Sequence, residues 1–200
     1  MSRDICKRLS NLMLISAFIS TLFYSASYPY IYAELMKVVP TFYISLEQLL
    51  ACIGTLLICS MWNKYSDRLF KHYAKMLVVE IVADVYLFAD VLIRNDLKFY
   101  FLLNILIYSI ITKHVACGGT KMRARVNPTE KTREKYDNNL SIVCSVATLL
   151  GIGLETILSP KLTTLFILAL IGNTIDNFFY LYIYRQIIKN NLKSEDDENE

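Results

Sequence analysis

Apolar residues in this chain gather into blocks of about twenty, separated by short polar stretches. An α-helix rises 1.5 Å per residue, so about twenty residues cross the roughly 30 Å hydrocarbon core of a bilayer. Hydrophobic residues make up 54 % of the sequence. We therefore predict an all-α integral membrane protein with six transmembrane helices, at residues 9–32, 40–62, 74–93, 99–118, 139–159 and 162–184.

The connections between these predicted helices are short, apart from residues 119–138, and they leave no room for a separate soluble domain. Residues 1–190 are therefore predicted to form one transmembrane bundle. The final segment, residues 191–200, is rich in Asp and Glu, and we predict that it is a disordered, solvated tail.

Lys and Arg fall mainly on one side of the predicted bundle. All but four of the 21 basic residues share that side, and the exceptions are Lys37, Arg94, Lys98 and Lys161. Basic residues near the ends of membrane helices stay on the cytoplasmic side. Both termini are therefore predicted to be cytoplasmic, in a protein of the plasma or inner membrane.

Several function classes lack their signatures here. The five cysteines are odd in number and form no CxxC pair, which argues against a disulfide framework or a zinc site. The absence of a GxxxxGKS/T stretch argues against ATP-driven transport, and two distant histidines argue against a catalytic metal centre. We expect no metal, no cofactor and no enzymatic activity. The net charge of +3 comes from predicted cytoplasmic loops, so it does not indicate a nucleic-acid partner.

The predicted cytoplasmic loop SMWNKYSDRLFKH, residues 60–72, carries charges in a particular order. The second half of this stretch contains Asp67, Arg68, Lys71 and His72. This order resembles the loop between helices 2 and 3 of the major facilitator superfamily of transporters, written G-x-x-x-D-(R/K)-x-G-(R/K)-(R/K). Asn63 and Phe70 stand at the two glycine positions of that pattern. The alternative is a loop that is merely solvated.

The resemblance extends to NPTEKTREKYDNNLSIVCSVATLLGIG, residues 127–153, which is similar to the stretch leading into the fifth helix of that family. Six helices are half of the usual twelve, and the two halves are related by an axis along the membrane normal. The resemblance therefore implies a parallel homodimer. It also implies that Asp67 meets the N-terminus of the fifth helix of the other protomer. Arg68 and Lys71 would then contact acidic groups or lipid phosphates.

Ionisable side chains within the predicted membrane segments are candidates for function, because charge is costly in hydrocarbon. Glu80 and Asp84 are four residues apart and so share one face of a helix. Lys113 lies at a depth that permits pairing with either of them, with His114 beside it, and Asp176 lies at a similar depth in the last predicted helix. A structural ion pair and a proton-coupling site are both consistent with these positions.

Two further carboxylates, Glu47 and Glu155, lie in the outer halves of the second and fifth predicted helices. In the resembling family these helices line the boundary between the two halves. Both glutamates would then face the dimer interface or the central path. The alternative is that they reach out to the nearby aqueous surface.

Two rows of polar residues are candidates for substrate binding. Ser20 and Tyr24 belong to a stripe along one face of the first helix, and Asn104 and Tyr108 belong to a similar row on the fourth, near His114. The first and fourth helices line the cavity in the resembling family. Such side chains can hydrogen-bond a solute. The alternative is that small and hydroxyl residues let membrane helices pack closely.

These features lead to two hypotheses. The first is a secondary transporter of a small solute, acting as a parallel homodimer by alternating access, with proton coupling as an option. Its expected partners are a second copy of the chain, membrane lipid and a small solute that the sequence does not identify. The second is a membrane accessory or immunity-type protein that binds another membrane protein and transports nothing.

Overall fold

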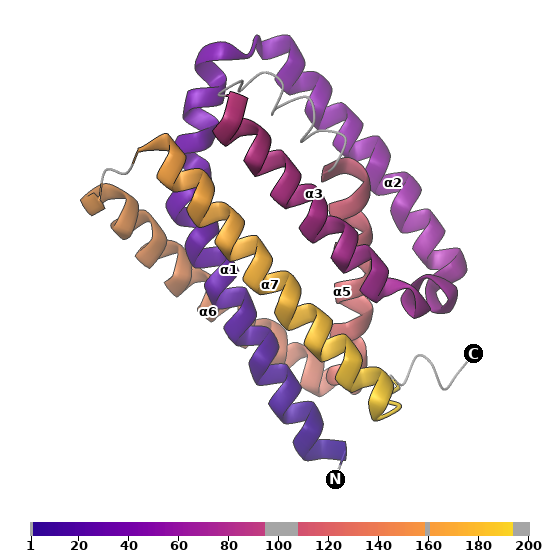
Figure 1. The fold of residues 1–200 in the computed structure, drawn as a ribbon. Coiled ribbons are helices and arrows are strands. Elements are labelled where there is room, and N and C mark those ends of the chain that lie inside the picture. The colour runs from indigo at the N-terminus through magenta and orange to yellow at the C-terminus, as the bar shows by residue number, and fades with distance from the viewer. Residues whose placement is uncertain (1, 95–107, 159–160, 194–200) are drawn as a thin grey trace.

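The computed structural model describes residues 2–94, 108–158 and 161–193. Within these ranges the chain is all-α, with six α-helices and one π-helical turn. They are α1 (Ser2–Val38), α2 (Thr41–Lys71), α3 (Tyr73–Arg94), the π-helical turn η1 (Tyr108–Thr112), α5 (Lys113–Val126), α6 (Glu130–Leu158) and α7 (Leu162–Lys189). The helices form an elongated bundle, and α1 begins at the end of the bundle where α7 finishes (Figure 1).

Four helices of the described chain are long and apolar enough to cross a membrane. The segments are Arg3–Val38, Thr41–Lys71, Glu130–Ile157 and Leu162–Lys189. This agrees with the prediction of a multi-pass membrane protein. α3 is 22 residues long, but Glu80, Asp84 and Asp90 interrupt its apolar character. Of the predicted fourth transmembrane helix, residues 99–107 lie outside the described part of the chain.

Helices continue further than the apolar blocks do. The predicted loop 60–72 is almost wholly helical, because α2 runs to Lys71 with a local irregularity at Tyr65 (φ −128°, ψ 31°). The predicted connection 119–138 belongs mostly to α5 and α6, which are separated only by residues 127–129. The predicted connections are therefore largely helical. Lys, Arg and Glu are good helix formers, so they extend a membrane helix beyond its apolar block.

Two apolar clusters hold the bundle, one towards each end. The first joins the beginnings of α1 and α3 to the ends of α2 and α7, and its buried members include Leu9, Met13, Phe70, Tyr73 and Ile183. The second joins the ends of α1 and α3 to the beginning of α7, through Ile31, Leu87, Phe88, Leu165 and Phe166. Between the clusters, the facing parts of these helices carry polar side chains, and the candidate site lies there.

Two glycines permit the close approach of α1 to its main neighbours, α6 and α7. A Cβ added to Gly151 of α6 would lie 2.6 Å from the carbonyl oxygen of Leu22, and one added to Gly172 of α7 would lie 2.6 Å from Cβ of Phe23. Small residues at such positions let membrane helices pack backbone against backbone. They position α1 as one wall of the polar region.

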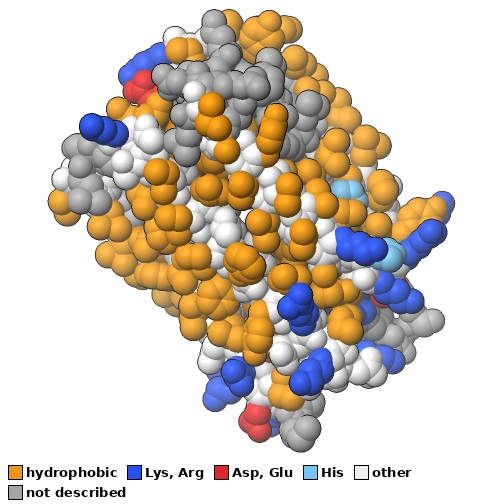
Figure 2. All heavy atoms as spheres, in the orientation of Figure 1, with side chains coloured by type: hydrophobic (Ala, Val, Ile, Leu, Met, Phe, Trp, Pro, Cys, Tyr) orange, Lys and Arg blue, Asp and Glu red, His pale blue; other side chains and the backbone are white. Residues whose placement is uncertain are grey.

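The face of the bundle seen in Figure 2 is largely apolar in its middle part. Strongly exposed apolar side chains of the bundle include Phe42 and Leu56 on α2, and Leu149 and Ile157 on α6. Lys and Arg gather mainly near the end where α1 begins and α7 finishes (Figure 2). Continuous apolar surface of this extent marks a contact with lipid or protein, and water is a poor solvent for it.

Candidate functional site

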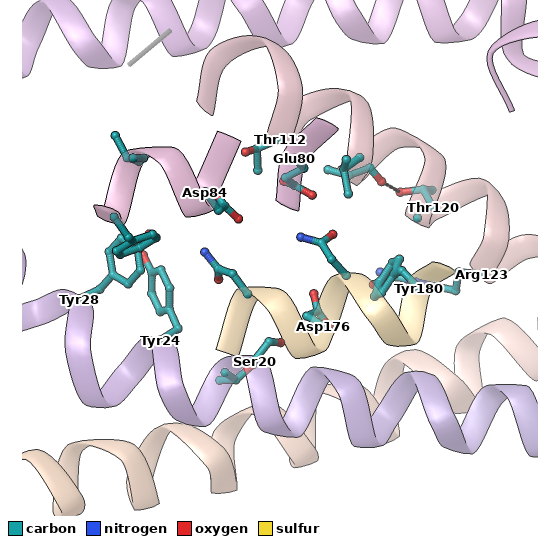
Figure 3. A pocket seen from close by; sticks show the side chains of 18 residues that line it. Ser20, Tyr24, Tyr28, Glu80, Asp84, Thr112, Thr120, Arg123, Asp176 and Tyr180 are labelled. Carbon is teal, nitrogen blue, oxygen red and sulfur yellow. Dashed lines mark hydrogen bonds between the residues drawn. The ribbon is translucent and has the colours of Figure 1, made fainter. Parts of the chain in front are cut away.

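A cavity of about 500 Å³ lies among α1, α3, α5 and α7. Figure 3 shows side chains from these helices directed towards a common space. The lining combines carboxylates, amides, hydroxyls and aromatic rings. Its polar members are Ser20, Thr21, Tyr24, Tyr28, Glu80, Asp84, Thr112, Thr120, Arg123, Asn173, Asp176, Asn177 and Tyr180.

Three carboxylates face this cavity from two helices. Glu80 and Asp84 lie one turn apart on α3, and both side chains are buried, with 6 % and 9 % of their surface exposed. Asp176 lies on α7 across the cavity (Figure 3). The sequence placed Glu80 and Asp84 on one face, and the structure adds Asp176 opposite them. The three acids thus belong to one site.

Neighbouring side chains offer each carboxylate a hydrogen-bond donor. Thr112 and Asn177 lie beside Glu80, and Asn173 lies beside Asp84. The hydroxyl of Ser16 on α1 donates to Asp176. These donors hold the carboxylates in place from three different elements, α1, η1 and α7. Movement of one helix against another would change the donors available to each acid.

Aromatic rings form the part of the wall contributed by α1. Tyr24 and Tyr28 stack with 4.2 Å between ring centroids and 21° between ring planes. Tyr24 is 56 % exposed, so the cavity is open at this point. Ser20, one turn earlier, also lines the cavity, with its hydroxyl donating to the carbonyl of Ala17 at 3.3 Å. The candidate substrate residues Ser20 and Tyr24 therefore do face a cavity.

Among the described residues that line the cavity, Arg123 of α5 is the one basic side chain. Its guanidinium pairs with Asp137 of α6 (Nη1 to Oδ1, 3.1 Å) and lies over the ring of Tyr136, 5.5 Å from the centroid. Its Nε is buried without a hydrogen-bond partner. We did not predict Arg123 as a site residue, because it lies beyond the apolar block and reads as an ordinary cytoplasmic arginine. The continuation of α5 brings it to the cavity.

Lys113 and His114 lie next to Thr112 in the chain but do not line the cavity. His114 is buried and faces α2, where its Nδ1 accepts a hydrogen bond from Nε1 of Trp62 at 3.0 Å. This contact fastens α5 to α2. The structure therefore gives His114 a packing role within the described chain, and Arg123 is the basic residue among the described residues of the cavity lining.

The remaining candidates lie elsewhere. Glu47 is on α2 and Glu155 is on α6, and neither lines the cavity. Both are partly exposed on the outside of the bundle. Tyr108 begins η1, and Asn104 falls outside the described residues. One and two turns further along the same face, Thr112 and Ala116 line the cavity.

Asp67 belongs to a separate polar cluster at the end of α2. Its carboxylate pairs with Nζ of Lys121 at 2.7 Å and with Nη2 of Arg125 at 3.4 Å, both on α5 of the same chain. The guanidinium of Arg125 also lies over the ring of Phe70, 4.4 Å from the centroid. The ends of α2 and α5 are therefore joined by charge. The expected contact of Asp67 with a second protomer stays a prediction.

Arg68 and Lys71 flank this cluster and are both exposed. The carbonyl of Lys71 accepts a hydrogen bond from the hydroxyl of Tyr184 on α7 at 3.0 Å. Their side chains are available to water or to lipid headgroups. The expected contacts of Arg68 and Lys71 with acidic groups or lipid phosphates stay predictions.

The fold and the cavity define a class: an all-α chain that carries four potential membrane-crossing helices and a carboxylate-lined cavity inside the bundle. No family model, no curated protein and no solved structure matches the chain.

Proposed function

We propose that the chain is a secondary membrane transporter of a small solute, which works by alternating access. One observation carries the proposal: Glu80, Asp84 and Asp176 face a cavity of about 500 Å³ inside an apolar bundle. Carboxylates within a membrane are costly, and they mark solute, ion or proton pathways more often than they serve packing. A volume of this size accommodates a small organic solute.

The charge of the lining supports a cationic solute or coupling to protons. The described residues of the lining include three acids and one arginine, and that arginine is already paired with Asp137. The stacked rings of Tyr24 and Tyr28 present aromatic faces, which attract cations. An anionic solute would meet repulsion from the carboxylates. We therefore assign the site to monovalent cations, or to protons that are exchanged for such cations.

We further propose six transmembrane helices with cytoplasmic termini, an arrangement similar to half of a facilitator-type transporter, and a parallel homodimer. The outer faces of α2 and α6 are strongly apolar, yet each carries one partly exposed glutamate, Glu47 or Glu155. These two glutamates support the dimer. These carboxylates are more stable at an interface between two copies than against lipid. The cavity itself lies within one chain, so each copy would hold its own site.

Purified protein in mild detergent is expected to have the mass of two chains once the contribution of detergent is subtracted. Light scattering coupled to gel filtration measures this mass. Cross-linking in native membrane through the exposed Cys52 of α2 provides an independent readout. A single-chain mass together with no cross-linked pair would contradict the dimer, while leaving transport by one chain to be tested.

Asp67→Asn is expected to slow transport strongly while the protein remains folded. The Asp67 side chain is 60 % exposed, so loss of its ion pairs costs less than about 1 kcal/mol of stability. It does remove the charge that joins α2 to α5. The assay follows proton release from reconstituted vesicles, with an enclosed pH dye, after addition of tetraethylammonium, choline or sodium.

Glu134→Gln is the matched control, because Glu134 is an exposed carboxylate on α6 outside both the cavity and the Asp67 cluster. It should leave proton release unchanged. If Asp67→Asn released protons at the wild-type rate, the Asp67 cluster would have no part in transport. If the wild-type protein released protons no faster than empty vesicles with every cation tested, the proposed cation transport would be contradicted. That result would favour the accessory-protein hypothesis.

A further inference from the structure

A second cavity, about 1120 Å³ in volume, opens at the end of the bundle where α1 begins. Its walls are the first turns of α1, the connection between α5 and α6, and the first turns of α6. The residues are Arg3, Asp4, Cys6, Lys7, Ser10, Asn11, Leu14, Val126, Asn127, Pro128, Thr129, Lys131, Thr132, Lys135, Tyr136 and Asn139. We propose that this cleft binds one anionic phospholipid, with the phosphate between α1 and α6.

Four basic residues surround the mouth of the cleft in two pairs. Arg3 and Lys7 lie one turn apart on α1, and Lys131 and Lys135 lie one turn apart on α6. All four side chains are exposed. Like charges four residues apart on a helix destabilise it. A phosphate between the two pairs relieves this repulsion and joins α1 to α6.

Apolar side chains form one part of the cleft wall, as a lipid site requires and a site for a soluble phosphate compound does not. They include Leu14, Val126 and Tyr136, and the last two are only 1 % and 4 % exposed. A basic rim above an apolar wall matches a phospholipid, whose anionic headgroup is joined to hydrocarbon. In the predicted topology the cleft lies at the cytoplasmic leaflet, which holds the anionic lipids that basic pockets between membrane helices recognise.

Buried hydrogen bonds make the floor of the cleft a fixed surface. Asn127 is 5 % exposed, and its Oδ1 accepts from the hydroxyl of Ser10 at 3.2 Å. Its Nδ2 donates to the carbonyl of Arg123 at 3.3 Å. These bonds tie α1 to the end of α5. A lipid bound above them finds a preformed site.

One side-chain contact separates this cleft from the carboxylate cavity. Tyr136 lines the cleft, and Arg123, which lies over its ring, lines the cavity. Lipid binding would therefore restrict the motion of α1 and α6 beside Arg123. The lipid site itself does not depend on transport, so it stands or fails separately from the proposed function.

Native mass spectrometry tests the proposal by comparing how much of each of three probes stays bound to the protein. Delipidated protein is mixed with phosphatidylglycerol, phosphatidylcholine or glycerol phosphate, and the adducts are counted. We expect one tightly held phosphatidylglycerol per chain and no comparable adduct with the other two probes. Replacement of Arg3, Lys7, Lys131 and Lys135 by Gln should weaken that binding by more than about tenfold, because basic side chains supply the attraction to anionic headgroups.

The control removes four basic residues outside the cleft at the same end of the bundle. In this variant Lys75, Arg185, Lys189 and Lys193, all exposed, are replaced by Gln. It has the same net charge as the cleft variant and should retain the lipid. Equal loss in both variants would overturn the proposal by showing general attraction to charge. Equal binding of glycerol phosphate would overturn it in favour of a soluble phosphate site.

Discussion

Gly118→Ala is expected to destabilise the protein at the contact between α3 and α5. A Cβ at position 118 would lie 2.0 Å from Cε2 of Tyr73 and 2.2 Å from its Cδ2, far inside the limit of van der Waals contact. Such overpacking costs roughly 1–3 kcal/mol in a close-packed interior. The gain in helix propensity on replacing glycine by alanine, about 1 kcal/mol, offsets only part of this.

The ring of Tyr73 has nowhere to move. It is fully buried, its hydroxyl donates to the carbonyl of Val115 at 2.9 Å, and it packs against the rings of Phe70, Trp62 and Tyr184. Relief of the clash therefore requires α3 and α5 to separate. That movement would open the wall of the cavity that bears Glu80.

Thermal stability in detergent measures the effect, as the temperature at which half of the monodisperse gel-filtration peak is lost. For a chain of this length we expect Gly118→Ala to lower it by roughly 5 °C or more. Gly153→Ala is the matched control on α6, since no atom lies within 4 Å of its added Cβ. The temperature of half loss for Gly153→Ala should match or slightly exceed that of the wild type. Wild-type stability of Gly118→Ala would show that α3 and α5 are further apart than described.

Asp84→Asn and Asp176→Asn are each expected to reduce cation-driven proton release to the level of empty vesicles. Asparagine preserves the size of the side chain and one acceptor oxygen but cannot carry a negative charge. The partners at the site, Asn173 and Ser16, remain in place. Loss of activity with retained folding would therefore report the charge itself.

Glu34→Gln serves as the control for these variants. Glu34 is a carboxylate of α1 that pairs with Lys37 at 2.6 Å and does not line the cavity. Initial rates, gel-filtration profiles and thermal stability would be recorded for each variant beside the wild type. Full activity of both Asp84→Asn and Asp176→Asn would place the pathway outside this cavity, and the proposed function would fail with it.

The cavity was only partly foreseeable from the sequence. Asn173, Asp176, Asn177 and Tyr180 recur at intervals of three or four, which is the spacing of one helix face. The same spacing selects Ser20 and Tyr24 on α1, and Glu80 and Asp84 on α3. Each stripe could be read from its own helix. Nothing in the sequence indicates that the three stripes face one another.

Arg123 and His114 show where reasoning from the sequence failed. His114 lies within an apolar block, among the candidate site residues, but α5 turns it towards Trp62. Arg123 lies beyond the same block, but α5 continues and carries it to the cavity. A hydropathy pattern reports depth in the membrane. It does not report the rotation of a helix about its axis.

The sequence by itself determined that the chain is helical and multi-pass, because a backbone in hydrocarbon must satisfy its own hydrogen bonds and a block of about twenty apolar residues is long enough to cross. That information is local to each helix. Only the tertiary structure decided which polar faces meet, since this depends on close approaches such as those at Gly151 and Gly172. Packing between distant segments brought the three carboxylates together and placed Arg123 in the lining of the same cavity.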